Sequence, residues 1–121
     1  MLELAAAAAG GAIGSLLRYG TGLLFARHTQ RGDRATLTVN LTGSFILGLL
    51  IGLGIQERIP LLYFFAGTGI LGGYTTYSTF MVQCVQMARE RKLLRLACYL
   101  LLTCCGGLLL GWAGMTVSCF L

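Results

Sequence analysis

The sequence predicts an all-α membrane protein of four transmembrane helices, and three observations support this fold class. Of the 121 residues, 56% are hydrophobic and 11% are charged, which is too apolar for a soluble domain. Four apolar segments reach the length of about 20 residues that a bilayer requires. The charged residues fall almost entirely at the ends of these segments or between them. A single membrane-embedded domain follows from this pattern.

The predicted spans leave little of the chain outside the bilayer. Residues 1–121 are expected to form one domain, with spans at approximately 4–26, 35–55, 60–88 and 93–120. The connections are too short to fold on their own, so any activity is expected within the membrane. Glu3 directly precedes the first apolar run, without the basic start or cleavage site of a signal peptide. The first segment is therefore predicted to be retained.

Each predicted span contains two glycines four residues apart, the spacing that lets membrane helices approach closely. The pairs are Gly10 with Gly14, Gly48 with Gly52, Gly69 with Gly73, and Gly107 with Gly111. Four helices of this size can barely enclose a pathway by themselves, so we expect a second subunit related by a twofold axis. Packing within one subunit is the alternative use of these glycines.

The third segment is interrupted by polar residues. The run GGYTTYSTF at 72–80 places a glycine pair, four serine or threonine residues and three aromatic rings between apolar stretches. Unpaired backbone at membrane depth is tolerated only where it lines a cavity or is buried in protein. The third helix is therefore predicted to be broken near its middle, with a functional polar centre at the break.

The second segment carries a polar stripe. Thr36, Asn40 and Ser44 are spaced four apart and so share one helix face. Asn40 is the most costly of the three in hydrocarbon, because its carboxamide needs partners for both oxygen and nitrogen. One interpretation is that Asn40 makes a structural hydrogen bond to another helix, and the other is that it belongs to a functional site.

An aromatic pair follows the interruption. Tyr77 and Phe80 are three residues apart and share a helix face. Packing is the ordinary role of such a pair, but ring edges carry partial positive charge. Ring edges together with the NH2 group of Asn40 are predicted to hold a small anion without a full positive charge, which would trap it.

Three strings resemble the signatures of the Fluc (CrcB) family of fluoride channels. They are GGAIG at 10–14 with Arg18, TLTVNLTG at 36–43 with Phe45, and GGYTTYSTF at 72–80. The resemblance covers essentially the whole chain. It implies an antiparallel, inverted dimer of four-helix subunits with two narrow pores, through which fluoride leaves the cell passively. It also implies a prokaryotic plasma membrane (the inner membrane if Gram-negative), fluoride resistance, no enzymatic activity and no nucleic-acid partner.

Carried over by position, the resemblance assigns roles to individual residues. Asn40 hydrogen-bonds fluoride, Tyr77 and Phe80 face it with their ring edges, and hydroxyls beside the pore are those of Thr36, Ser78 and Thr103. The backbone carbonyls of Gly72 and Thr75 from both subunits are implied to hold a structural sodium ion (Na+) at the dimer centre. Arg18 matches an arginine late in the first helix; snorkelling to the interface is its alternative role. Tyr77 departs from the family pattern, which usually has phenylalanine there.

Basic residues are distributed unevenly among the connections. Only Arg58 lies in the second connection, whereas seven lie in or beside the first and third: Arg27, Arg31, Arg34, Arg89, Arg91, Lys92 and Arg95. The positive-inside rule then predicts the first and third connections in the cytoplasm and both termini outside. A homodimer with both orientations and a heterodimer with an oppositely oriented paralogue both stay open.

Other classes of function are less compatible with the sequence. A small multidrug exporter needs a carboxylate within the membrane, but the acids lie at span ends or in connections: Glu3, Asp33, Glu57 and Glu90. A purely structural or assembly subunit leaves Asn40 and the polar interruption unexplained. An enzyme is disfavoured because the sole histidine, His28, lies in a connection, and no nucleophile has a base at a recognisable spacing. The five cysteines show no metal-ligand spacing.

Overall fold

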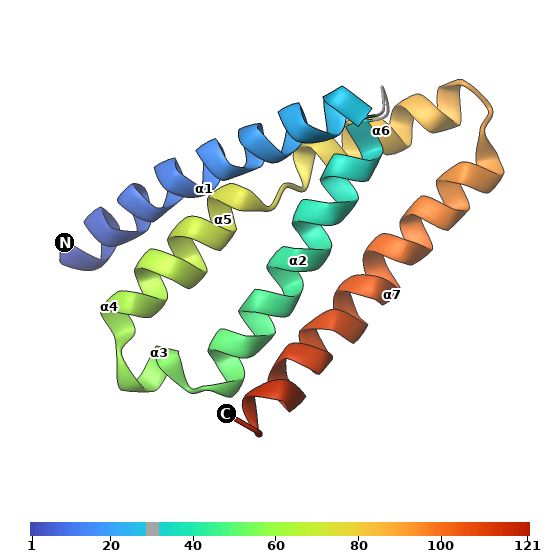
Figure 1. The fold of residues 1–121 in the computed structure, drawn as a ribbon. Coiled ribbons are helices and arrows are strands. Elements are labelled where there is room, and N and C mark those ends of the chain that lie inside the picture. The colour runs from blue at the N-terminus through green and yellow to red at the C-terminus, as the bar shows by residue number, and fades with distance from the viewer. Residues whose placement is uncertain (29–31) are drawn as a thin grey trace.

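The computed structural model describes residues 1–28 and 32–121, which are largely helical and contain no strand (Figure 1). This confirms the all-α class. The elements are α1 (Leu2–His28), α2 (Gly32–Gly52), α3 (Ile55–Arg58), α4 (Pro60–Tyr63), the π-helical segment η1 (Phe64–Leu71), α5 (Gly72–Tyr74), α6 (Ser78–Arg89) and α7 (Leu93–Ser118). Arg31, one of the basic residues of the first connection, lies outside the described residues.

The helices form two closely packed pairs. α1 runs along η1 and α5, and α2 runs along α7 over most of its length (Figure 1). After the break in the third segment, α6 crosses to the start of α7, where the two helices contact each other. By length and apolar composition, two described helices, α2 and α7, are able to cross a membrane.

Glycines bring the helices of each pair into backbone contact. A Cβ atom added at Gly14 would lie 2.0 Å from the Ile70 carbonyl oxygen, and one at Gly48 would lie 2.1 Å from that of Gly111. These contacts join α1 to η1 and α2 to α7 within a single subunit. The predicted close packing is therefore present, but these glycines do not by themselves argue for a second subunit.

The helix of the second predicted span is shifted toward the N-terminus. The sequence predicts a span over 35–55, whereas α2 begins at Gly32 and ends at Gly52. Gly54 adopts a φ of 66°, in the left-handed region that glycine enters without steric cost, and this reverses the chain before α3. Pro60 then occupies the first turn of α4, where the missing N–H costs no helical hydrogen bond.

The break in the third segment lies beyond the glycine pair. Gly72 keeps helical angles, with φ −61° and ψ −40°, and α5 continues to Tyr74. Thr75 is extended, with ψ 160°, and α6 begins at Ser78. The interruption therefore falls inside the predicted 72–80 run, after its glycine pair. Gly73 serves packing instead, because a Cβ there would lie 2.3 Å from the Gly11 carbonyl oxygen.

We predict that Gly14→Ala destabilises the protein and that Gly20→Ala, in the same helix, does not. The added methyl at 14 overlaps the Ile70 carbonyl, whereas nothing lies within 4 Å of a Cβ at Gly20. Overpacking of this kind costs about 1–3 kcal/mol, and alanine in an open helical site is neutral or stabilising. Thermal unfolding in detergent measures both; equal midpoints for the two variants would contradict the packing described here.

Candidate functional site

The Asn40 side chain from α2 bridges the break in the third segment. Its Nδ2 donates to the Thr76 carbonyl oxygen at 2.9 Å, and its Oδ1 accepts from the Thr76 backbone N–H at 2.9 Å. One carboxamide thus satisfies both backbone groups of a residue outside the helical hydrogen-bond ladder. The two residues are 36 positions apart in sequence. We call this pair of hydrogen bonds the Asn40 clamp.

The clamp explains why the helix can be interrupted here. In a continuous helix the Thr76 N–H would donate to the Gly72 carbonyl, but it donates to Asn40 instead. The Thr76 hydroxyl accepts from the Thr79 backbone N–H at 3.3 Å, which caps the start of α6. On α2, Ser44 donates to the Asn40 carbonyl oxygen at 2.9 Å. The polar groups at the break are thus largely paired within the subunit.

Arg18 from α1 is a second anchor of the break. Its Nη1 donates to the Thr75 carbonyl oxygen at 3.2 Å, across 57 positions of sequence. Arg18 is half-buried and its guanidinium lies at the break, so the snorkelling alternative does not describe this contact. The structure therefore places a guanidinium at the break itself, bound to the backbone of Thr75.

The two rings that the sequence singles out have different environments. The Phe80 side chain is 7% exposed and packs against the ring of Tyr99 in α7, with centroids 5.2 Å apart. Tyr77 is 74% exposed, and its ring centroid lies 6.3 Å from that of Phe80. Tyr99 in turn donates to Gln83 Oε1 at 2.6 Å. Aromatic contacts therefore connect the break to α7.

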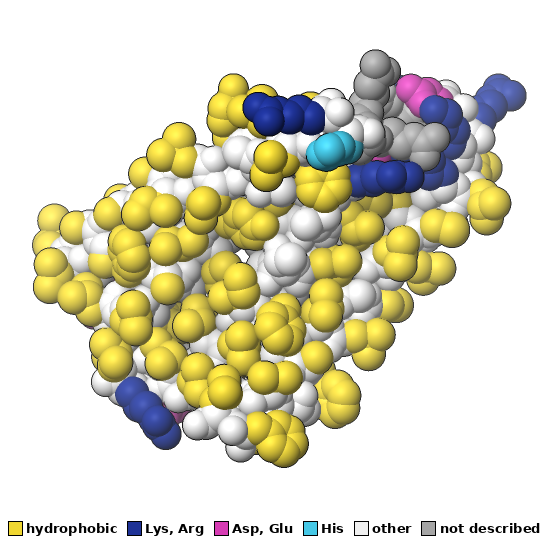
Figure 2. Space-filling model, in the orientation of Figure 1, with side chains coloured by type: hydrophobic (Ala, Val, Ile, Leu, Met, Phe, Trp, Pro, Cys, Tyr) yellow, Lys and Arg dark blue, Asp and Glu magenta, His cyan; other side chains and the backbone are white. Residues whose placement is uncertain are grey.

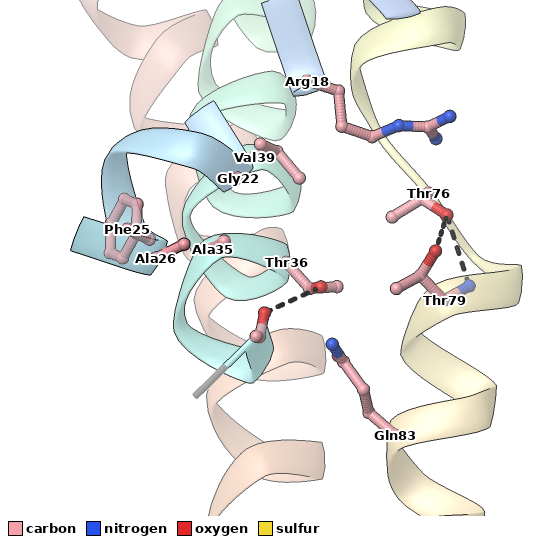
Figure 3. Close-up of a pocket in the computed structure, with 11 residues that line it drawn as sticks. Arg18, Gly22, Phe25, Ala26, Ala35, Thr36, Val39, Thr76, Thr79 and Gln83 are labelled. Carbon is pink, nitrogen blue, oxygen red and sulfur yellow. Dashed lines mark hydrogen bonds between the residues drawn. The ribbon is translucent and has the colours of Figure 1, made fainter. Parts of the chain in front are cut away.

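Two cavities meet at the clamp. The first, of about 370 Å³, is lined by residues that include Arg18, Thr36, Thr76, Thr79 and Gln83. Figure 3 shows Thr36 on α2 and Gln83 on α6 directed toward each other across it. The second, of about 490 Å³, is lined by residues that include Asn40, Ser44, Thr68, Thr75, Thr76 and Tyr77. Thr76 lines both cavities, so the clamp lies where they adjoin.

A third, more polar cavity lies at the end of the molecule where α2, α6 and α7 meet. It has a volume of about 500 Å³, and its lining includes Asp33, Glu90, Lys92 and Arg95. Arg95 and Asp33 form an ion pair at 2.5 Å, and Lys92 pairs with Glu90 at 2.9 Å. Gln83 and Gly32 line both this cavity and the first one. The cavities therefore share walls from the charged end to the break.

Not every predicted site residue joins this group. Ser78 is exposed, and Ser78, Thr103 and Phe80 line none of the three cavities; Phe80 reaches the group through its ring contact with Tyr77, which lines the second cavity. The Thr103 hydroxyl is buried in α7 and has no hydrogen-bond partner among the described residues. Thr36 lines the first cavity but donates to the Gly32 carbonyl at 3.2 Å. Gly72, for its part, lines the second cavity.

Sequence reasoning missed Gln83, Tyr99 and the roles of Thr76 and Thr79. Gln83 lies three residues after Phe80, so helical spacing places it on the same face. Tyr99 is a polar-tipped ring within an apolar helix, a position where its hydroxyl needs a partner. The helical spacing of Gln83 and the polar hydroxyl of Tyr99 in an apolar helix are both visible in the sequence.

Together, the fold and the site define an all-α protein in which a broken apolar helix places a clamped polar centre between two cavities. A family model described as CrcB-like protein, Camphor Resistance (CrcB), matches residues 5–115. The chain belongs to this family.

Individual relatives agree with the family assignment. The chain is 42% identical over 108 residues to a fluoride-specific ion channel FluC of Gloeobacter violaceus, covering 87% of this chain and 86% of the relative. It is 40% identical over 111 residues to fluoride-specific ion channel FluC 1 of Geobacillus kaustophilus, covering 92% and 93%. It is 37% identical over 119 residues to FluC 2 of Lactobacillus johnsonii, covering 98% of each chain. The resemblance in the sequence is thus confirmed.

We predict that Asn40→Asp lowers the stability of the protein. An ionised carboxylate cannot donate to the Thr76 carbonyl and sets two oxygens against each other, which costs about 1–3 kcal/mol for an unsatisfied buried group. Ser44→Ala is the matched control on the same helix, because its hydroxyl donates only within α2. Thermal unfolding in detergent would contradict the clamp if Asn40→Asp were as stable as Ser44→Ala.

Proposed function

We propose that the chain is a subunit of a fluoride-selective ion channel that lowers cytoplasmic fluoride by passive export. The observation that carries this proposal is the clamped helix break, whose polar groups line the two adjoining cavities. Membership of the CrcB family and the names of the relatives, fluoride-specific ion channels, supply the identity of the anion. Recognition and release of an anion, with no chemical conversion, are the functions that this site supports.

The groups at the break suit a small hydrogen-bonding anion. The Asn40 NH2 has two N–H groups, and the clamp uses one of them. The other donates to no described residue, and Asn40 lines the second cavity. Arg18 adds positive potential, but its donation to the Thr75 carbonyl fixes it at the backbone. Binding is then favourable enough for entry and weak enough for release.

The arrangement of the cavities supports a route for the anion. It runs from the charged third cavity past Gln83 into the first cavity, and then past Thr76 into the second. The hydroxyls of Thr36, Thr79 and Thr76 lie along the middle section. The Thr36 hydroxyl donates to the Gly32 carbonyl and the Thr76 hydroxyl to that of Thr79. Thr79 is therefore the residue of the three whose O–H is left to replace part of the hydration shell of the anion. Ser78 and Thr103, which the resemblance also assigns to the pore, remain proposals on that ground alone.

A second subunit completes the proposed pore. Tyr77 is 74% exposed although it lines the second cavity, so a large ring at the site is left uncovered by its own chain. An inverted dimer, either of identical chains or with an oppositely oriented paralogue, would cover it and provide the two pores. The four spans of each subunit are then α1, α2, the broken segment 60–89 and α7, in a prokaryotic plasma membrane.

A structural sodium ion at the dimer centre is part of the same proposal, and the residues fit it only in part. The Gly72 carbonyl has lost its helical donor to the clamp, and freed carbonyl oxygens suit a hard cation. The Thr75 carbonyl instead accepts from Arg18, whose charge opposes a cation at that atom. No step of the transport proposed here depends on the ion.

The function is tested by fluoride flux from liposomes. Purified protein is reconstituted in vesicles loaded with potassium fluoride, valinomycin is added, and fluoride release is followed with a selective electrode. A matched potassium chloride preparation is the control. Rapid fluoride release with little chloride release is expected. If well-folded protein released no fluoride, either alone or with a co-expressed paralogue, the proposal that the chain forms a fluoride channel would be refuted.

We predict that Phe80→Ile abolishes fluoride release while leaving most of the protein folded. Isoleucine keeps apolar bulk against Tyr99 but has no ring edge. Val82→Ile is the matched control, because Val82 lies in the same helix and is 65% exposed. The liposome assay measures both, with size-exclusion profiles as the folding readout. Unchanged flux in Phe80→Ile would remove this ring from the mechanism.

We predict that Tyr77→Phe keeps or raises the fluoride flux. The ring contact with Phe80 at 6.3 Å is retained, and only an exposed hydroxyl is removed. The same electrode assay decides between two roles for the residue: complete loss of flux would show that the hydroxyl, and not the ring, is required.

A further inference from the structure

Basic side chains without acidic partners gather at one end of the molecule. The two ion pairs among the described residues engage Lys92 and Arg95. Four exposed arginines at the same end form no ion pair with a described residue: Arg27, Arg34, Arg89 and Arg91. Figure 2 shows most Lys and Arg side chains on the visible face at this end, beside a surface that is otherwise largely hydrophobic. The end therefore carries a net positive charge at the edge of the apolar surface.

An apolar groove runs along α6 toward this basic end. Its volume is about 450 Å³, and it is lined by Met81, Val82, Val85, Gln86 and Arg89. These positions follow the i, i+1, i+4, i+5, i+8 spacing of one helix face. The rise of a helix gives the groove a length of roughly 12 Å. The three apolar side chains are exposed, and Arg89 closes the end of the row.

The turn after α6 keeps an arginine where glycine would fit better. Arg91 has a φ of 56°, its N–H donates to the Ala88 carbonyl at 3.1 Å, and the Lys92 N–H donates to that of Met87 at 3.0 Å. This is a Schellman motif, whose left-handed position usually holds glycine. A side chain there carries steric strain. Arg91 therefore adds a charge next to Arg89 at a conformational cost.

The acidic residue in the turn does not cancel this charge. Hydrogen bonding and charge from Lys92 lower the pKa of Glu90, so this carboxylate is ionised and paired with its own lysine. Arg89 and Arg91 are left as the unpaired charges beside the groove. A guanidinium binds a phosphate through two parallel N–H donors, which an ammonium cannot do.

We propose that the α6 groove binds one anionic phospholipid. The acyl chain lies along Val85, Val82 and Met81, and the headgroup phosphate is bound by Arg89, with Arg91 adjacent. The apolar groove ends at two arginines that form no ion pair, and this matches a lipid whose acyl chain ends at an anionic headgroup. Basic residues at the end of membrane helices are attracted to an anionic leaflet in the same way.

Native mass spectrometry of the full-length protein in detergent tests this proposal. The protein is titrated with phosphatidylglycerol or with phosphatidylcholine of identical acyl chains, and bound lipids are counted. We expect about a tenfold preference for phosphatidylglycerol. The double variant Arg89→Gln with Arg91→Gly should lose this preference, and Val85→Trp, which fills the groove, should lose both lipids. Arg91→Gly relieves the strained turn, so misfolding does not account for its effect.

The controls separate this site from its alternatives. Arg58→Gln removes an arginine from the second connection and should leave the lipid preference unchanged. An equal loss in Arg58→Gln would overturn the proposal in favour of general charge attraction. Displacement of the lipid by inorganic phosphate would overturn it in favour of a simple anion site. A changed subunit number in Val85→Trp would show that a second copy of the chain covers the groove instead.

Discussion

The hydrogen bonds between the Asn40 carboxamide and the Thr76 backbone are the interaction on which the rest of the site depends. A backbone N–H and carbonyl released from a helix are costly in a medium without water. An asparagine side chain has one acceptor and one donor group at the right separation to satisfy both. It does so from a neighbouring helix, so the broken segment is attached to α2 at the point where it is weakest.

Close packing of the helices at glycines determines the positions of the Asn40 clamp and of the side chains around it. Glycines allow α1 to touch η1 and α5, and this brings Arg18 within 3.2 Å of the Thr75 carbonyl. Glycines likewise seat α7 against α2. From there Tyr99 reaches both the ring of Phe80 and the amide of Gln83. A polar centre with two adjoining cavities results from helices that are fixed on both sides of the break.

Much of this arrangement is predictable from sequence, because local patterns carry it. Apolar length and low charge indicate the all-α class, and the GGYTTYSTF run indicates an interrupted helix with Asn40 as a costly polar residue nearby. The exact position of the break is not local information. Gly72 and Gly73 keep helical backbone, Gly73 packs closely against Gly11 of α1, and the break follows at the residue that Asn40 can pair. The contacts of Arg18 with Thr75 and of Tyr99 with Gln83 join separate helices, so spacing along one helix does not predict them.

The most direct test of the clamp is hydrogen–deuterium exchange of the backbone around Thr76 in the wild type and in Asn40→Ala. The clamp predicts that the Thr76 amide is protected in the wild type and exchanges rapidly in the variant, while peptides from α7 keep their protection. Unchanged protection at Thr76 in folded Asn40→Ala would show that another group satisfies this amide, and would contradict the clamp as the basis of the site.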